Sequence, residues 1–114
     1  MKARKLIFGL YADRSGLNWV EDIIRSAACE RGVCVQRTEV CSYPDADIPD
    51  YGFLGDQWRD EHPGKRPGDR RPVELRATVP CSLRVWRALR KEVLRRMCPE
   101  GNHPHTCEVP WMAM

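Results

Sequence analysis

The stretch VELRATVPCSLRVWRALRKEVLRRM, residues 73–97, decides the fold, because it joins a strand pattern directly to an amphipathic helix pattern. Residues 73–79 predict a strand, which Pro80 ends. Ser82 can cap the helix that follows, and Cys98-Pro99 ends this helix. The buried helix face is predicted to consist of Leu83, Trp86, Leu89, Val93, Leu94 and Met97.

The N-terminal part of the chain carries a second strand–helix pair and a further strand. Lys5 to Tyr11 is a short apolar run bounded by charges, which predicts a buried strand. Asn18 and Glu21 form a capping-box pattern at the start of a helix, and Gly32 ends that helix. Its predicted apolar face comprises Trp19, Val20, Ile23, Ile24, Ala27 and Ala28. Residues 33–43 alternate and are β-branched, so another strand follows.

The remaining segments complete the predicted order of elements. Residues 44–72 hold five of the nine prolines and four of the eight glycines, which favours a long loop. Residues 106–111 can form a last short strand. The order is therefore β-α-β, loop, β-α-β, and it predicts a ferredoxin-like α+β fold with a four-stranded antiparallel sheet and two helices on one face. The length of 114 residues fits a single domain, residues 1–114.

Composition and the cysteines bound the class of protein. A hydrophobic content of 42% and a charged content of 31% are typical of a soluble globular chain. The apolar run from Leu6 to Tyr11 is too short for a signal peptide or a membrane span. We therefore expect a cytoplasmic protein with no membrane partner and with reduced thiols. The cysteines are Cys29, Cys34, Cys41, Cys81, Cys98 and Cys107.

Positive charge is concentrated on the second predicted helix. The whole chain has a net charge of only +3, which does not by itself imply nucleic-acid binding. Residues 81–97 nevertheless hold one acid, Glu92, against the basic residues Arg84, Arg87, Arg90, Lys91, Arg95 and Arg96. Four of them, the arginine stripe of Arg84, Arg87, Lys91 and Arg95, follow one helical face. Like charges on adjacent turns repel, so an acidic surface opposite the arginine stripe would stabilise it.

Three interpretations of the arginine stripe stay open. An external partner, either a nucleic acid or an acidic protein, would be gripped by the planar guanidinium groups. Alternatively, acids of the 44–72 segment fold over the helix and neutralise it; these are Asp45, Asp47, Asp50, Asp56, Asp60 and Glu61. In the third interpretation the basic face is simply solvated.

A compact set of cysteine and histidine residues lies near the C-terminus. Cys98, His103, His105 and Cys107 would supply the four ligands of a tetrahedral zinc site. Their spacing differs from the common zinc-finger spacings, and a polar turn with surface histidines is the alternative. The earlier cysteines Cys29, Cys34 and Cys41 are interpreted as core or edge residues.

The 44–72 segment also carries aromatic residues that suit recognition. Tyr51, Phe53 and Trp58 are candidate partner-binding residues, because aromatic side chains dominate interface hot spots. The alternative is that they attach the segment to the rest of its own fold. The acidic run from Asp45 to Asp50 lacks the ligands and the glycine of an EF-hand loop.

Nucleotide-binding and hydrolase motifs are absent from the sequence. We therefore expect a non-enzymatic inhibitor or adaptor without a cofactor, whose second helix docks on an acidic surface. The partner would be a nucleic acid or a protein complex that handles nucleic acid, and a small phage or mobile-element inhibitor would suit this description. The alternatives are a zinc-stabilised interaction domain and a small thiol-dependent enzyme using Cys34 or Cys107.

Overall fold

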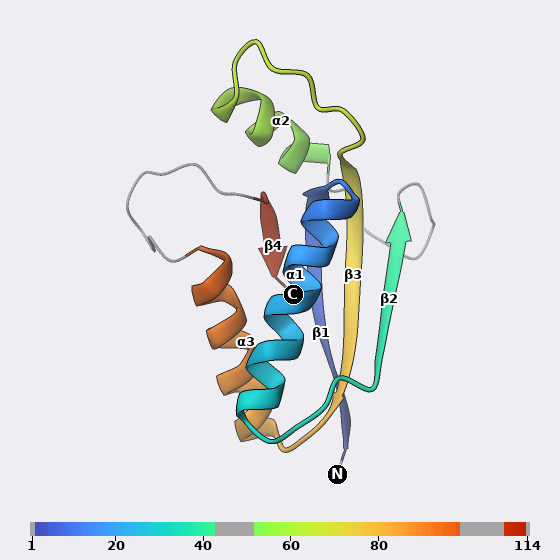
Figure 1. Ribbon diagram of the computed structural model, residues 1–114, viewed down its shortest axis with the longest axis vertical. Helices are drawn as coiled ribbons and strands as arrows, with labels where there is room; N and C mark the ends of the chain where they lie inside the picture. The colour runs from blue at the N-terminus through green and yellow to red at the C-terminus, as the bar shows by residue number, and fades with distance from the viewer. Residues whose placement is uncertain (1, 43–51, 99–108, 114) are drawn as a thin grey trace.

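A four-stranded antiparallel sheet with three helices forms an α+β fold in a computed structural model that describes residues 2–42, 52–98 and 109–113. Figure 1 shows the elements in space. In chain order they are β1 (Ala3–Ala12), α1 (Arg14–Glu30), β2 (Arg37–Ser42), α2 (Gly52–Glu61), β3 (Arg71–Pro80), α3 (Leu83–Met97) and β4 (Trp111–Ala113). The strand order is β2-β3-β1-β4, with the long strands β1 and β3 at the centre.

Helices α1 and α3 each connect two strands that are not neighbours in the sheet, with one other strand between them. Strands β1 and β3 pair along their whole length, and β2 pairs with the outer side of β3. Strand β4 pairs only with residues 8–10 of β1. The chain therefore passes from β1 through α1 to β2 with β3 between the two strands, and from β3 through α3 to β4 with β1 between them.

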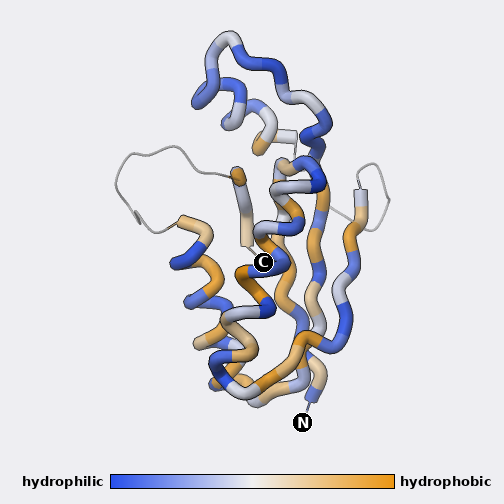
Figure 2. The backbone as a smooth tube through the Cα atoms, viewed as in Figure 1, coloured by the Kyte–Doolittle hydropathy of each residue, from blue (hydrophilic) through white to orange (hydrophobic). Residues whose placement is uncertain are grey.

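The main core lies between the sheet and helices α1 and α3. Alternate side chains of β1, such as Leu6 and Phe8, are fully buried together with Leu75 of β3. Ile24 of α1 and Leu89 of α3 close this core from the helical side. Figure 2 shows hydrophobic stretches along β1 and β3, whereas α2 and the turn after it are mostly hydrophilic. Each large apolar side chain buried in this way contributes roughly 1.5–3 kcal/mol.

Helix α1 begins five residues before the predicted start, because its N-cap is Asp13 and not Asn18. The Asp13 carboxylate accepts a hydrogen bond from the Gly16 amide at 2.8 Å and caps the helix, so Asn18 lies inside it. Ser15 and Gly16 are weak helix formers, which hid this first turn from the sequence pattern. The predicted C-terminal end is confirmed, because Gly32 adopts a positive φ of 71° directly after the C-cap residue Arg31.

Helix α3 follows its prediction closely. The Ser82 hydroxyl accepts a hydrogen bond from the Val85 amide, and the helix ends at Met97. Leu89, Val93 and Met97 are buried as predicted. Leu83 is an exception, since it is 41% exposed at the first turn, beyond the edge of the core.

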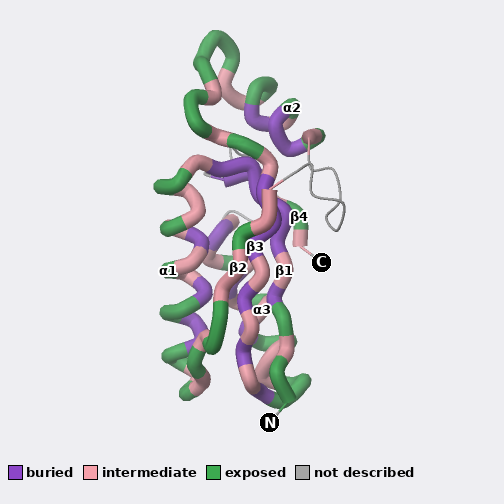
Figure 3. The backbone as a smooth tube through the Cα atoms, turned by 90° about the vertical axis from the view of Figure 1, so that its right-hand side faces the viewer, coloured by how far each residue is buried: buried purple, intermediate pink, exposed green. Residues whose placement is uncertain are grey.

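The prediction of an irregular loop over residues 44–72 is wrong for part of its length, because residues 52–61 form α2. Two glycines in one short helix obscured it in the sequence. Gly55 packs closely on Tyr11, since a Cβ at this position would lie 3.1 Å from a ring carbon. Figure 3 shows α1 and α2 on different sides of the strands, and the burial of Tyr11, Leu54 and Trp58 as a second cluster agrees with that arrangement.

The two outer strands are shorter than predicted. Strand β2 begins at Arg37 rather than at residue 33, so Cys34 precedes the strand. Strand β4 begins at Trp111, the last residue of the predicted 106–111 strand, and residues 106–108 lie outside the described residues. Both are edge strands, where fewer side chains pack and the sequence pattern is weaker.

Candidate functional site

Helix α3 carries the candidate site, and its exposed face is basic. Arg84, Arg87, Lys91 and Arg95 are exposed, as the spacing of the arginine stripe predicts. Arg90 and Arg96 are partly buried on the flanks of this face. The opposite side of the helix enters the main core through Leu89 and its neighbours, so the orientation of the basic face is fixed by packing.

The C-terminal turn of α3 is neutralised by two glutamates. Glu92 accepts hydrogen bonds from Arg95, at 2.5 and 3.1 Å, and from Arg96, at 3.0 Å. Arg96 also pairs with Glu30 at the end of α1. The hydrogen bonds from Arg95 and then Arg96 lower the pKa of Glu92 from 4.5 to about 2. The hydrogen bond to Glu30, followed by that to Glu92, raises the pKa of Arg96. This part of the basic face is therefore paired internally.

The rest of the helix differs from this turn. Within residues 2–42, 52–98 and 109–113, no ion pair involves the set that we call the unpaired bases, namely Arg84, Arg87, Arg90 and Lys91. The predicted neutralising acids of α2 are engaged elsewhere: Asp56 pairs with Arg59, and Glu61 accepts a hydrogen bond from Gln57. Asp45, Asp47 and Asp50 lie outside the described residues. Asp60 is exposed on α2, at the other end of the molecule (Figure 1).

The tertiary structure brings a second basic segment to the start of α3. Lys2, Ala3, Arg4 and Lys5 line an open groove of about 250 Å³ together with Leu83 and Trp86, and we call it the basic groove. The Trp86 indole Nε1 donates a hydrogen bond to the Lys5 carbonyl oxygen at 2.9 Å. The Arg4 Nε donates to the Cys81 carbonyl oxygen at 3.0 Å. These contacts hold the indole and the guanidinium in the lining of the groove.

Sequence reasoning missed the basic groove. Lys2, Arg4 and Lys5 stand more than eighty residues before Trp86, and nothing in either segment signals that they meet. A signal could have been found in Trp86 and Leu83 themselves. The helical pattern predicts both residues on the buried face of the helix. They lie at the margin of that face, next to solvent or to the edge of a strand.

The predicted aromatic binding residues separate into different environments. Trp58 is only 3% exposed, packs on Tyr11 and stacks on His62 with 4.6 Å between ring centroids. The Arg70 guanidinium covers the same indole at 4.7 Å. Trp58 therefore attaches α2 to the sheet and is not available to a partner. Phe53 is 51% exposed and remains a candidate, and Tyr51 lies outside the described residues.

The predicted zinc ligands are mostly outside the described residues. Cys98 is partly buried at the end of α3, whereas His103, His105 and Cys107 lie outside the described residues. In the described part of the chain, no group of three or more His, Cys, Asp or Glu residues could hold a metal ion. Cys29, Cys34, Cys41 and Cys81 are free thiols, with Cys29 and Cys34 exposed and Cys81 fully buried.

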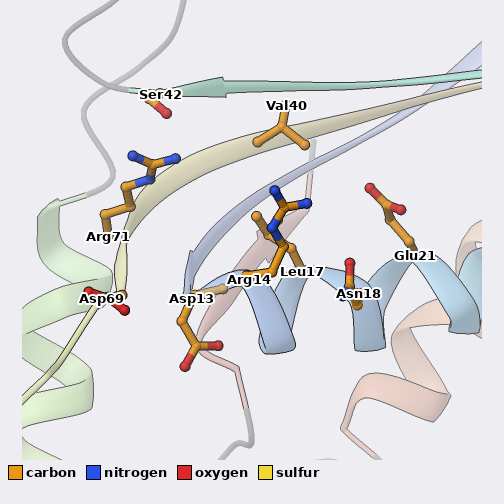
Figure 4. Close-up of a pocket in the computed structure, with 10 residues that line it drawn as sticks. Asp13, Arg14, Leu17, Asn18, Glu21, Val40, Ser42, Asp69 and Arg71 are labelled. Atoms are coloured by element: carbon orange, nitrogen blue, oxygen red, sulfur yellow. The ribbon is translucent and has the colours of Figure 1, made fainter.

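A larger cleft, of about 510 Å³, lies between the N-terminal turns of α1 and strand β2. Arg14 and Glu21 point from α1 toward β2, and Arg71 of β3 closes one side (Figure 4). Val40 of β2 faces the same space and is 42% exposed. Because acidic, basic and apolar groups are mixed here, the lining selects no ligand class as clearly as the basic face of α3 does.

Comparison with protein-family models, with curated proteins and with solved structures gives no match. None of the helices in the described segments combines the length and the apolar composition that a membrane crossing requires. Functional inference therefore depends on the geometry and charge of the chain's own residues.

Proposed function

We propose that this chain is a non-enzymatic binding protein whose helix α3 docks on an acidic surface of a macromolecular partner. The observation that carries the proposal is the set of unpaired bases, which meet no acid within the described segments. Arginine predominates in this set, and its planar fork binds phosphates and carboxylates in a bidentate manner. An adaptor or an inhibitor needs such a surface and no catalytic group.

The position of these charges on the helix supports the same proposal. Arg84 lies in the first turn of α3, where the helix dipole disfavours a cation, and the first turn holds no acid. Arg84, Arg87 and Lys91 also repel one another on adjacent turns. Since these charges lower the stability of the isolated helix, binding an acidic partner is the simplest reason for their arrangement.

The fold suits this role, and we infer that it is the ferredoxin-like arrangement with α2 as an added helix. The order β2-β3-β1-β4, with each helical connection passing over one strand, supports that inference. Helix α3 then rests on a rigid sheet that holds its exposed side chains in a fixed pattern. A cytoplasmic location is part of the proposal, because Cys29, Cys34, Cys41 and Cys81 are free thiols.

A charge-reversal experiment tests the proposal. The double variant Arg87→Glu/Lys91→Glu is compared with Lys65→Glu/Arg66→Glu, which reverses two exposed charges in the turn after α2. Binding is measured to three probes: a single-stranded oligonucleotide, a duplex and polyglutamate. The wild type and the control are expected to bind at least one probe, and the α3 variant is expected to lose about tenfold or more in affinity.

Melting curves accompany these measurements, so that lost binding is not confused with lost structure. The α3 variant is expected to melt at or above the wild-type temperature, because both of its residues are exposed and repel basic neighbours in the wild type. Unchanged affinity in the α3 variant, or a wild type that binds none of the probes, would contradict the proposal. If the reversal unfolds the protein, Arg87→Gln/Lys91→Gln provides the same comparison.

A further inference from the structure

The basic groove combines one aromatic ring with positive charge from two separate segments. Lys2, Arg4 and Lys5 belong to β1 and the residue before it, whereas Leu83 and Trp86 belong to the first turn of α3. None of the described residues that line the groove is acidic. Arg87 is the next residue of α3 and Arg90 lies one helical turn after Trp86, so further positive charge follows the groove along the helix.

The edge of the sheet beside this groove is open but is not free to accept another strand. Strand β4 pairs with β1 only from Phe8 to Leu10, which leaves the first part of that edge without a β4 partner. At Lys5 the backbone carbonyl already accepts the hydrogen bond from the Trp86 indole. An added β-strand would compete with the indole for this acceptor, so a peptide paired along the edge is disfavoured.

The composition of the surface distinguishes between the remaining acidic partners. A protein interface has an apolar centre from which charges, lysine above all, are depleted. Here the arrangement is reversed, since one indole and one leucine are surrounded by lysine and arginine. The phosphates of a nucleic-acid duplex would also bind these positive charges, but the duplex exposes only the edges of its nucleobases within the grooves, so no base face is available to an aromatic ring. In a single strand, by contrast, the nucleobases are free to stack on aromatic rings while the phosphates follow a positive groove.

We propose that the basic groove binds single-stranded nucleic acid. One nucleobase stacks on Trp86, and the phosphate backbone of the strand follows Lys2, Lys5 and the basic side chains of α3 that we call the unpaired bases. This inference rests on the proposed function and names the chemistry of its partner. The bond from the indole to the Lys5 carbonyl oxygen holds the ring in place before binding, so little side-chain freedom is lost when a base stacks on it. The readout is tolerant of sequence, because every base has a stacking face.

Fluorescence anisotropy with labelled oligonucleotides tests this inference. The probes are a single strand of about 20 nucleotides, longer than the ~4–16 nucleotides that one small binding fold covers, in RNA and DNA forms, with the matching duplex and polyglutamate as competitors. We expect a single-stranded probe to bind about tenfold more tightly than the duplex. The RNA and DNA arms show which kind of strand is preferred.

Three variants locate the strand on the protein. Trp86→Leu keeps apolar volume but removes the stacking face, and we expect it to weaken single-strand binding about tenfold with little effect on the weaker duplex binding. Lys2→Glu/Lys5→Glu should weaken single-strand binding and lower its dependence on salt, by a slope of roughly 0.7 for each lost phosphate contact. The control Lys65→Glu/Arg66→Glu should change neither quantity. Quenching of tryptophan fluorescence by the single strand should be smaller in Trp86→Leu than in the wild type.

Each outcome either supports or overturns the inference. If the duplex or polyglutamate binds as tightly as the single strands and Arg87→Glu/Lys91→Glu abolishes that binding, the proposed function stands and the single-strand inference fails. If the wild type binds no acidic probe, both fail. Wild-type single-strand affinity in Trp86→Leu also overturns the inference. Should Trp86→Leu melt at a lower temperature than the wild type, Trp86→Phe replaces it, with a smaller loss of affinity expected.

Discussion

The two ends of helix α3 carry the same kind of side chain in different surroundings. In the last turn, Arg95 and Arg96 bond to Glu92, and Arg96 also reaches Glu30 of α1. Earlier in the helix, Arg84, Arg87 and Lys91 have no such partner among the described residues. The availability of a charge on α3 therefore depends both on an acid of the same helix, Glu92, and on an acid of the neighbouring helix α1, Glu30.

Helix electrostatics reinforce this difference. Cations in the last turn are favoured by the helix dipole, so Arg95 and Arg96 stabilise the end at which they lie. Cations in the first turns are disfavoured there and gain nothing from the fold. The paired end of α3 is therefore joined to α1 through Arg96 and Glu30, whereas the start of α3 carries the charges that we propose bind a partner.

The largest expected effect on stability comes from weakening the packing of α3 against the sheet. Leu89→Ala removes a fully buried side chain from the main core and is expected to lower the free energy of unfolding by roughly 2–5 kcal/mol. Leu83→Ala is the matched control, because the same change is made on the same helix at a 41% exposed position. Urea unfolding measures both variants. Equal losses in the two would mean that the burial pattern of α3 is not the one described.

Replacing basic side chains by glutamine at each end of α3 compares the bases without an ion pair directly with the paired arginines of the last turn. Arg87→Gln/Lys91→Gln is expected to weaken binding of an acidic probe about tenfold and to leave the melting temperature unchanged. Arg95→Gln/Arg96→Gln removes the same charge and is expected to lower the melting temperature while weakening binding less. Titration calorimetry and melting curves on the two variants give both quantities. The reverse pattern would contradict the division of the helix into a paired and an unpaired part.

A smaller effect is expected from the acid that neutralises the paired end. The pKa of Glu92 is lowered to about 2 by the hydrogen bonds from Arg95 and Arg96. Its contribution to stability is therefore present above its ordinary pKa of 4.5 and is lost as the pH falls toward 2. Glu92→Gln should melt a few degrees below the wild type at neutral pH, because exposed ion pairs are weak. The difference should disappear near pH 2, and a difference that persists there would assign the effect to packing.

The smallest expected effect concerns the segment that follows α3. We expect purified protein to hold less than about a tenth of an equivalent of zinc by elemental analysis, since the spacing from Cys98 to Cys107 is atypical of zinc sites. Cys107→Ser should then leave the melting temperature unchanged. Stoichiometric zinc would place a further positive ion beyond the paired end of α3 and would favour the zinc-stabilised alternative.

Prediction from the sequence succeeded where local signals agree with packing. Residues 73–79 were predicted as a strand and lie in β3, and Ser82 caps α3 as its sequence pattern indicates. The exposed positions of Arg87 and Lys91 follow from helical spacing alone. In these elements one face is strongly apolar, so the period of the sequence fixes both the type of element and its orientation.

Prediction failed where a distant contact decides the local structure. Helix α2 contains Gly52 and Gly55, which lower helix propensity, and it is held by the burial of Trp58 against Tyr11. The basic groove could not be predicted, because Lys5 and Trp86 meet only through the pairing of β1 with β3 and the return of the chain along α3.

The sequence by itself determined the α+β class, the position of α3 and the basic character of its exposed face, because residue spacing and side-chain chemistry act over a few turns. Helical spacing also places Glu92 beside Arg95 and Arg96, whereas only the tertiary structure decided the contacts that other elements supply. Glu30 reaches Arg96 because α1 packs beside α3, and Lys2 and Lys5 join Trp86 because β1 runs past the start of the same helix. Such contacts arise from the packing of segments that are distant in the chain, and no local pattern encodes them.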